Sequence, residues 1–342
     1  MLKMSLTAED RVAVTALAGE LAARFGTVES AEFQREARTH AEELPRRLRQ
    51  AVHEFRLAES SGVFLLSGLE VADEHLGPTP AHWRDRDGRS PTLPYDVVFY
   101  LVACLLGEPI GWATQQDGRI MHDVFPIREH AHEQIGWGSE ELLAWHTEDA
   151  FHPMRTDYLG LLCLRNPDEV ETTFADVADA ELDERTRELL FEERFYILPD
   201  NSHRPENQLG GDSDDDAAAR LRQRSRERVD RALADPTPVA VLFGSREAPY
   251  VRIDPYYMQY PHGVTQRRAL ERIETALDAA LTGAVLRPGD MCFLDNYRMV
   301  HGRKPFRARF DGTDRWLRRL NVTRDLRKSR ELRLTAESRV IF

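Results

Sequence analysis

Residues 145–164 read WHTEDAFHPMRTDYLGLLCL, and this stretch is the most informative for the fold. Its second half, residues 158–164, is a short apolar run of the kind that forms a buried β-strand. Side chains alternate along an extended segment, so His146 and Glu148 project to the same side and can reach one ion. A helix would direct them to different faces. We therefore predict a ligand pair in the turn that leads into a core strand.

A third candidate ligand follows a second pair of strand signals. Residues 284–290 read AVLRPGD and predict a strand and a turn, and residues 291–295 predict a further strand before His301. Two imidazoles and one carboxylate hold iron on one face in non-haem Fe(II) oxygenases and leave its other positions open. We predict that His146, Glu148 and His301 bind Fe(II) at the rim of a β-barrel.

Two arginines stand shortly after His301. Arg315 and Arg319 lie four residues apart around an apolar Trp316-Leu317. A guanidinium fork binds a carboxylate through two parallel hydrogen bonds, so an arginine near the iron could hold the distal carboxylate of 2-oxoglutarate. The alternative of a zinc hydrolase uses similar ligands, but such enzymes usually present both histidines on one helix as His-Glu-X-X-His, which is absent here.

Four longer motifs carry a resemblance to a known family. They are residues 145–161, 241–244 (VLFG), 254–258 (DPYYM) and 311–325 (DGTDRWLRRLNVTRD). Together they resemble the clavaminate synthase-like branch of the Fe(II)/2-oxoglutarate dioxygenases, over roughly residues 61–330. Within that branch the chain most resembles the arginine and asparagine β-hydroxylases of antibiotic biosynthesis.

The resemblance implies a role for each matching residue. His146, Glu148 and His301 match the catalytic iron ligands, and Arg315 matches the arginine that grips 2-oxoglutarate, with Thr173 as a helper. Oxygen is the other co-substrate. The residues implied for substrate binding are Gln115 near the α-amino group, Glu148, Asp200 and Ser202 in a lid, Asp254 for the side chain, and Arg319 for the α-carboxylate.

The substrate residues also have plainer interpretations. Gln115 also fits a polar strand surface, and Asp254 precedes Pro255, which suits a turn former. The arginine hydroxylases of the family carry two carboxylates one residue apart, whereas Arg252 and Tyr256 flank Asp254 at that spacing. Arg318, between Arg315 and Arg319, should point to the opposite face of the strand as a solvated or structural residue. His122 and His152 have no assigned role.

Composition limits the class of protein. With 42% hydrophobic and 30% charged residues, the 342-residue chain can bury a large core. Its net charge of −12 argues against nucleic acid as a partner, because a phosphate backbone requires a basic surface. Three separated cysteines indicate reduced thiols of a cytoplasmic protein, and no targeting or membrane-spanning stretch stands out. The expected partner is a small amino acid, and the sequence does not predict an oligomeric state.

The expected fold class is α+β, with a double-stranded β-helix (jelly-roll) core, flanking helices and a lid insertion. We expect one oxygenase domain over residues 1–342, with an N-terminal helical region at 1–60 and a lid at 199–220. Residues 1–25 should contain a helix capped by Thr7, and a second helical region at roughly 31–59 should break or restart at Pro45. Residues 111–123 look like a hairpin with an Asp-Gly turn.

The predicted activity is Fe(II)/2-oxoglutarate-dependent hydroxylation of an unactivated C–H bond, at the β-carbon of free L-arginine or a closely related basic amino acid, in natural-product biosynthesis. Lysine, asparagine or a carrier-bound amino acid are alternative substrates. A non-catalytic metal- or metabolite-binding barrel is the alternative from another class. The intact arginine pair beside an intact triad counts against it, since an inactive site need not retain a co-substrate clamp.

Overall fold

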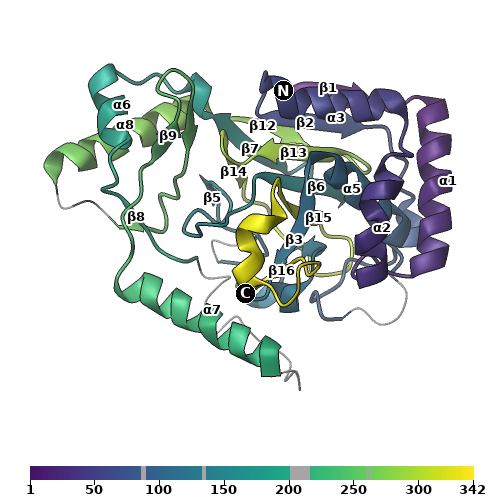
Figure 1. Cartoon of the computed structure of the whole chain (residues 1–342). Helices are drawn as coiled ribbons and strands as arrows, with labels where there is room; N and C mark the ends of the chain where they lie inside the picture. Colours follow the sequence, from purple (N-terminus) through teal and green to yellow (C-terminus); the bar gives the residue numbers. More distant parts are fainter. Residues whose placement is uncertain (86–89, 133–135, 201–215, 260, 262) are drawn as a thin grey trace.

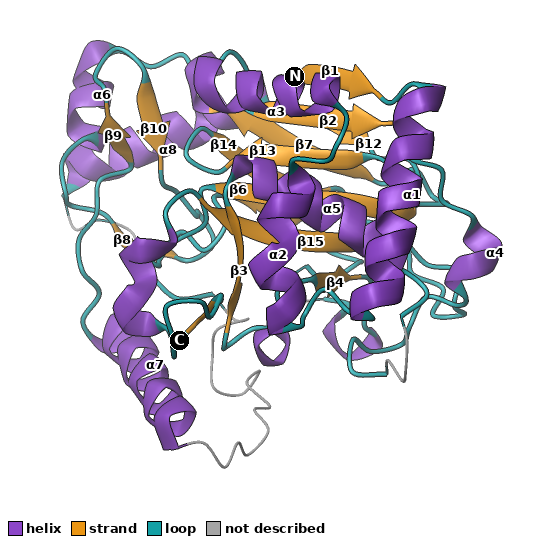
Figure 2. Cartoon of the chain, turned by 45° about the vertical axis from the view of Figure 1, so that its right-hand side comes forward, coloured by secondary structure: helices purple, strands orange, loops and turns teal. Residues whose placement is uncertain are grey.

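Two β-sheets pack face to face, and helices cover the outer face of each (Figures 1 and 2). This computed structural model describes residues 1–85, 90–132, 136–200, 216–259, 261 and 263–342. Ser202 and most of the predicted lid at 199–220 lie outside the described residues. In the described part of the chain no helix is long and apolar enough to cross a membrane.

The larger sheet has eight described strands, in the order β1-β2-β13-β6-β15-β3-β16, with β4 also paired to β15. Their bounds are β1 Leu2–Ser5, β2 Val63–Ser67, β3 Glu108–Trp112, β4 His122–Val124, β6 Tyr158–Arg165, β13 Met291–Asp295, β15 Trp316–Thr323 and β16 Val340–Ile341. The pairs are antiparallel except β1 with β2 and β3 with β16. Strand β6 is buried along its whole length, as its apolar sequence predicts.

The smaller sheet has the described order β12-β7-β14-β5. Its strands are β5 Leu143–His146, β7 Glu171–Asp176, β12 Thr282–Val285 and β14 Met299–Arg303. Apolar side chains of the two sheets meet in one cluster, which includes Leu159 and Cys163 from the larger sheet and Phe174 and Met299 from the smaller. Burial of such side chains contributes about 25 cal/mol per Å² of apolar surface, so this cluster fixes the spacing of the two sheets.

Four helices cover the outer face of the larger sheet: α1 Ala8–Phe25, α2 Ala31–Ala41, α3 Arg46–Ala58 and α5 Leu93–Leu106 (Figure 2). Helix α5 is apolar on all sides because it lies between the sheet and the other helices. It approaches β6 closely at Gly160, where an added Cβ would lie 2.9 Å from ring atoms of both Phe99 and Phe293. A side chain at this position would push the helix off the sheet.

The smaller sheet is covered by α8 Val264–Ala280, which packs on β7 and on α6 Glu184–Leu190. Helix α4 spans Asp73–Leu76. Helix α7 spans Asp216–Ala234, below the sheets in Figure 1, and lines a cavity together with Trp112 of β3 and Ile341 of β16. The described 3-10 helices are Gln116–Gly118, Arg128–His130, Val177–Asp179 and Leu326–Leu332. Two short ladders complete the fold, β8 Tyr196–Ile197 with β11 Met258–Gln259, and β9 Leu242–Gly244 with β10 Pro249–Val251.

Several sequence predictions are confirmed and two are wrong. Thr7 caps α1 through a capping box with Asp10, and Pro45 precedes α3. Residues 2–5, within the helical region predicted at 1–60, form strand β1, because the edge of β2 offers them backbone partners. Residues 111–123 are not a hairpin either: β3 and β4 do not pair with each other, since both pair with β15.

Candidate active site

The two histidines of the predicted triad lie side by side on the smaller sheet. His146 ends β5 and is the direct cross-strand partner of His301 on β14. Their ring centroids are 4.6 Å apart. Cross-strand partners project to the same face of a sheet, so both imidazoles point into the space between the two sheets. The 155 residues of sequence that separate them are bridged by a single strand pair.

Glu148 completes this group. Its Oε2 lies 3.7 Å from His146 Nε2 and 3.3 Å from His301 Nε2. One ligand atom from each of the three residues lies within 4.8 Å of the other two. His146 Nδ1 is 2.9 Å from the carbonyl oxygen of Ala144 and donates to it, which leaves Nε2 as the ligand atom. This donor set matches the two-His, one-carboxylate face that binds non-haem Fe(II).

The backbone of Glu148 is held by Asn296. The Asn296 side chain accepts a hydrogen bond from Glu148 N at 2.8 Å and donates to Glu148 O at 3.0 Å and to Thr156 O at 2.9 Å. Immediately afterwards Asp149 adopts a left-handed backbone conformation with φ of 49°. The chain therefore turns sharply after Glu148, and Asn296 fixes the carboxylate against the histidines.

Electrostatics favour an ionised Glu148 in this buried group. Burial raises the pKa of its carboxyl, but the charge of Arg319 and the contacts with both histidines outweigh burial and hold the pKa well below its usual range. Burial lowers the pKa of His146, yet the contact with Glu148 and the charge of Asp254 raise it to about 9. The pKa of His301 is lowered, mainly by burial. The protein thus supplies a local negative field that suits a cation.

One end of the cavity between the sheets contains Arg315. Its side chain is buried, and burial lowers its pKa to about 10. Its Nη2 lies 3.4 Å from Thr172 Oγ1, and its Nε has no hydrogen-bond partner among the described residues. Thr172 lines the cavity, whereas Thr173, the residue predicted from sequence, faces away and packs near Gly302. The side chain beside Arg315 is therefore Thr172, one residue earlier.

Arg303 adds a second cation at the same end. It is buried, lines the cavity, and donates from its guanidinium to the carbonyl oxygens of Ser139, Lys304 and Glu141. Burial and the nearby charge of Arg315 lower its pKa to about 9. Neither arginine forms an ion pair with a described carboxylate. This end can accept a small anion such as a carboxylate.

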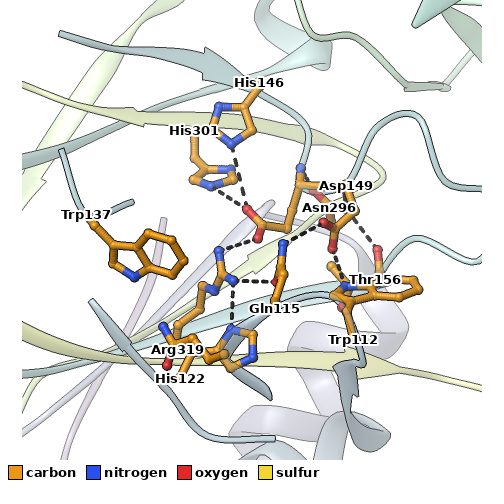
Figure 3. Close-up of polar contacts among 12 residues, drawn as sticks. Trp112, Gln115, His122, Trp137, His146, Asp149, Thr156, Asn296, His301 and Arg319 are labelled. Atoms are coloured by element: carbon orange, nitrogen blue, oxygen red, sulfur yellow. Dashed lines mark hydrogen bonds and ion pairs between the residues drawn. The ribbon is translucent and has the colours of Figure 1, made fainter. Parts of the chain in front are cut away.

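The other arginine, Arg319, lies on the far side of the triad. Its Nη1 donates to Glu148 Oε1 at 2.6 Å, and its Nη2 donates to Gln115 Oε1 and to His122 Nδ1, both at 2.8 Å (Figure 3). Gln115 Nε2 faces Asp149 at 3.4 Å. Glu148 therefore contacts the histidines through one oxygen and Arg319 through the other. Gln115 and Arg319 are both predicted from sequence as substrate-binding residues, and the structure places them in direct contact.

Two acidic residues line the cavity opposite these groups. Asp254 lies close to the triad because Thr147 N, between His146 and Glu148, donates to the carbonyl oxygen of Ile253 at 2.9 Å. The β8–β11 ladder brings Asp200 to the same region, and the two carboxylates repel each other. Burial first, and then the charge of Asp200, raise the pKa of Asp254 to about 6, against the lowering effect of His146.

Arg318 points to the opposite face of β15, as the strand alternation predicts. It is buried rather than solvated, and it forms ion pairs with Asp96 and Asp123 beneath helix α5. Trp316 Nε1 also donates to Asp123 at 2.9 Å. This network joins the helices to the sheet, and of its members only Asp123 lines the cavity.

Comparison with known proteins agrees with this geometry. Residues 43–321 match the family model described as taurine catabolism dioxygenase TauD, TfdA family. The chain belongs to the TauD/TfdA family of dioxygenases. An enduracididine beta-hydroxylase of Streptomyces hygroscopicus is 61% identical, and an L-ornithine/L-arginine 3-hydroxylase of Catenulispora acidiphila is 44% identical, each over the full length of both chains.

A solved relative extends the comparison to bound ligands. The non-heme iron oxygenase OrfP in complex with Fe, succinate and (3S)-hydroxy-L-Arg has 42% sequence identity and a TM-score of 0.93, with both chains fully covered. OrfP has also been solved with Fe and alpha-ketoglutaric acid. This chain is an iron- and 2-oxoglutarate-dependent dioxygenase that hydroxylates an amino acid.

Sequence reasoning missed several residues of this TauD/TfdA dioxygenase site. Asn296 and Thr172 carry no motif that could have singled them out. Asp149 is part of the motif beside Glu148, and Trp112 Nε1 donates to its Oδ2 at 2.6 Å. No sequence pattern gives His122 a role, although it contacts Arg319 directly. Ser202 lies outside the described residues, so its predicted place in the dioxygenase remains a prediction.

Proposed function

We propose that this dioxygenase hydroxylates the β-carbon of L-arginine or of a closely related basic amino acid, such as the enduracididine for which a 61%-identical relative is named. The observation that carries the proposal is the pair of carboxylates, Asp254 and Asp200, in the same cavity as the triad and Arg319. A guanidinium opposite two acids and an α-carboxylate opposite an arginine give a matched pair of charges at the two ends of one amino acid.

The carboxylate pair also accounts for a departure from the family pattern. The acid expected one residue away from Asp254 is missing, since Arg252 and Tyr256 stand at that spacing. Arg252 is engaged with the carbonyl oxygens of Ala150 and Phe151 at 2.6 and 2.8 Å. Asp200, from a distant segment, supplies a second negative charge near Asp254 and so replaces the missing acid.

His146, Glu148 and His301 are the proposed iron ligands, because their donor atoms converge and no other described group meets this condition. Arg315, with Thr172 beside it and Arg303 nearby, would hold the distal carboxylate of 2-oxoglutarate. Iron, 2-oxoglutarate and O₂ together supply the oxidation that converts C–H to C–OH, with release of succinate and carbon dioxide. The chain's own residues choose the carbon by position alone.

In this proposal Arg319 binds the substrate α-carboxylate, while Gln115 and Glu148 face the α-amino group. These contacts fix the backbone end of the amino acid beside the triad, so that the β-carbon is the nearest unactivated carbon. The lid predicted at residues 199–220 lies mostly outside the described residues and stays a prediction. We further propose that residues 1–342 form one oxygenase domain and that its two facing sheets are the double-stranded β-helix core of the family.

The test is a substrate survey with the reconstituted protein. Protein loaded anaerobically with Fe(II) would be mixed with 2-oxoglutarate, O₂ and one amino acid at a time, including L-arginine, enduracididine, L-lysine and L-asparagine. We expect a product heavier by one oxygen atom with a guanidino amino acid, and NMR should place the hydroxyl on the β-carbon. Hydroxylation of asparagine or lysine in preference would overturn the substrate assignment.

A matched variant tests the iron site by a readout other than turnover. His301→Ala should lose bound iron as well as hydroxylation, whereas His152→Ala should retain its iron, because His152 lies outside the three-ligand group. Unchanged iron content and activity in His301→Ala would refute the proposed ligand set.

A further inference from the structure

His122 is the cross-strand partner of Arg319. Strand β4 pairs antiparallel with β15, and in this register His122 stands directly opposite Arg319. The His122 side chain is 1% exposed, and its Nδ1 lies 2.8 Å from Arg319 Nη2 (Figure 3). Arginine is always a donor, so Nδ1 must accept this hydrogen bond.

The other ring nitrogen fixes the tautomer. His122 Nε2 lies 2.9 Å from the carbonyl oxygen of Arg119, which can only accept, so Nε2 carries the proton. Burial, and next the charge of Arg319, hold the pKa of His122 well below its usual value. The imidazole is therefore neutral, and its one lone pair is directed at the guanidinium.

The segment before His122 is anchored from outside the active site. Both carboxylate oxygens of Glu29 accept backbone hydrogen bonds at 2.9 Å, from Ile120 N and Met121 N. Glu29 lies in the link between α1 and α2. The helical layer thus holds the backbone of β4, and ligand binding in the cavity need not disturb it.

The three partners of Arg319 differ in what else they do. Glu148 belongs to the iron site, and Gln115 also contacts Asp149. The contacts of both residues with Arg319 can therefore change when iron and the amino acid bind. Among the described residues His122 contacts no other side chain by a hydrogen bond, and it does not line the cavity. It is the partner whose contact with Arg319 can persist throughout the reaction.

We propose that His122 is a positioning residue that fixes the guanidinium plane of Arg319, so that the remaining N–H groups of Arg319 face the α-carboxylate of the amino acid. This inference rests on the proposed function, in which Arg319 binds that carboxylate. In the neutral Nε2–H tautomer, the Nδ1 lone pair holds Arg319 in place. The substrate backbone is then held at a fixed orientation beside the triad. This orientation determines how tightly hydroxylation is coupled to 2-oxoglutarate consumption.

Two substitutions separate the two ring nitrogens. In His122→Asn the amide oxygen can occupy the place of Nδ1 and accept from Arg319, while the contact with Arg119 is lost. In His122→Gln the amide nitrogen can occupy the place of Nε2 and donate to Arg119, while Arg319 loses its acceptor. Both variants leave a polar group of similar size in the same buried position, so they are matched for any effect on folding.

We expect His122→Gln to raise the KM for the amino acid by about 10-fold or more, since a hydrogen bond to a charged group contributes about 1.5–3 kcal/mol and each 1.4 kcal/mol is tenfold. The KM for 2-oxoglutarate should not change, and the ratio of hydroxylated product to succinate should fall. His122→Asn should recover most of the affinity and the coupling. Calorimetric titration of L-arginine into the anaerobic Fe(II)/2-oxoglutarate complex gives the same comparison without turnover.

Arg319→Ala and the double variant complete the test. If His122 acts through Arg319, the double variant His122→Gln/Arg319→Ala should bind the amino acid no more weakly than Arg319→Ala alone. Equal losses in His122→Asn and His122→Gln, or additive losses in the double variant, would overturn the positioning role. A wild-type KM for the amino acid in Arg319→Ala would instead refute the proposed function of Arg319 itself.

Discussion

Arg315 and Arg319 lie four residues apart in sequence but have opposite electrostatic surroundings. Arg315 has one long contact, with Thr172 at 3.4 Å, and no ion pair with a described carboxylate. Arg319 donates to Glu148, Gln115 and His122 at 2.6–2.8 Å. A buried cation that the protein leaves unbalanced requires an anion from outside. A cation that the protein surrounds with acceptors is held in a set orientation before its ligand arrives.

Arg318 stands between the two in sequence, and its role is structural. It is as deeply buried as Arg315, yet two aspartates balance its charge and it faces helix α5 instead of the cavity. The three arginines therefore differ in how far the protein itself satisfies them. Arg318 is satisfied by the protein alone and stabilises the fold, Arg319 is partly satisfied, and Arg315 is free to bind a ligand. The following experiments test this order.

The largest effect should come from unbalancing Arg318. Asp96→Ala removes the acceptor of Arg318 Nε and Nη2 at 2.8 and 3.1 Å. Breaking a buried ion pair costs about 3–5 kcal/mol, so the free energy of unfolding in denaturant should fall by that amount. Glu36→Ala is the control, because its partly exposed pair with Arg24 should contribute no more than about 1 kcal/mol. Equal losses in both variants would contradict the structural role of Arg318.

Removal of Arg315 should have the reverse signature. Arg315→Met keeps an elongated side chain but removes an uncompensated buried charge, so the free energy of unfolding should not decrease. The KM for 2-oxoglutarate should rise about 100-fold, since loss of one partner of a buried charge pair costs about 2–5 kcal/mol. The KM for the amino acid in saturating 2-oxoglutarate serves as the control. A destabilised protein with normal 2-oxoglutarate affinity would show that Arg315 has a structural role like that of Arg318.

The amino-acid end should depend on pH through Asp254. Its pKa in the ligand-free protein is about 6, raised chiefly by burial, and only the ionised carboxylate attracts a guanidinium. Affinity for L-arginine should therefore be full above pH 6 and should fall as pH drops through that value, by about tenfold per pH unit. Asp254→Asn should bind weakly at all pH values and lose this limb of the profile. A limb that persists in Asp254→Asn belongs to another group.

The smallest effect separates two neighbouring threonines. Thr172→Val removes the hydroxyl next to Arg315, and the KM for 2-oxoglutarate should rise by a factor of about 2–10, as expected for loss of one hydrogen bond of about 0.5–1.5 kcal/mol. Thr173→Val is the matched control, since Thr173 does not line the cavity. A larger effect in Thr173→Val would favour the residue predicted from sequence.

Much of the active site could be predicted from sequence because its signals are local. The alternation of His146, Thr147 and Glu148 in an extended segment gives two ligands on one side without knowledge of the fold. The apolar run at β6 and the strand signals before His301 predict buried strands for the same reason. The helices α1 and α3 follow from their apolar periodicity and from Thr7 and Pro45.

The errors share a physical cause. Strand β1 and the pairing of β3 and β4 depend on backbone partners far away in sequence, and local patterns carry no information about them. Thr172, which lies beside Arg315, is one residue before the predicted Thr173, and in a strand one residue changes the face.

The sequence by itself determined the chemistry, since the triad and the arginine pair are residue types at fixed spacings. Only the tertiary structure decided which groups share the cavity. It opposed His122 to Arg319 across β4 and β15, brought Asp200 to Asp254 through the β8–β11 ladder, and buried Arg318 on the other face of β15. These contacts join segments 54 to 222 residues apart, and such pairings are set by strand register and sheet packing rather than by any local pattern.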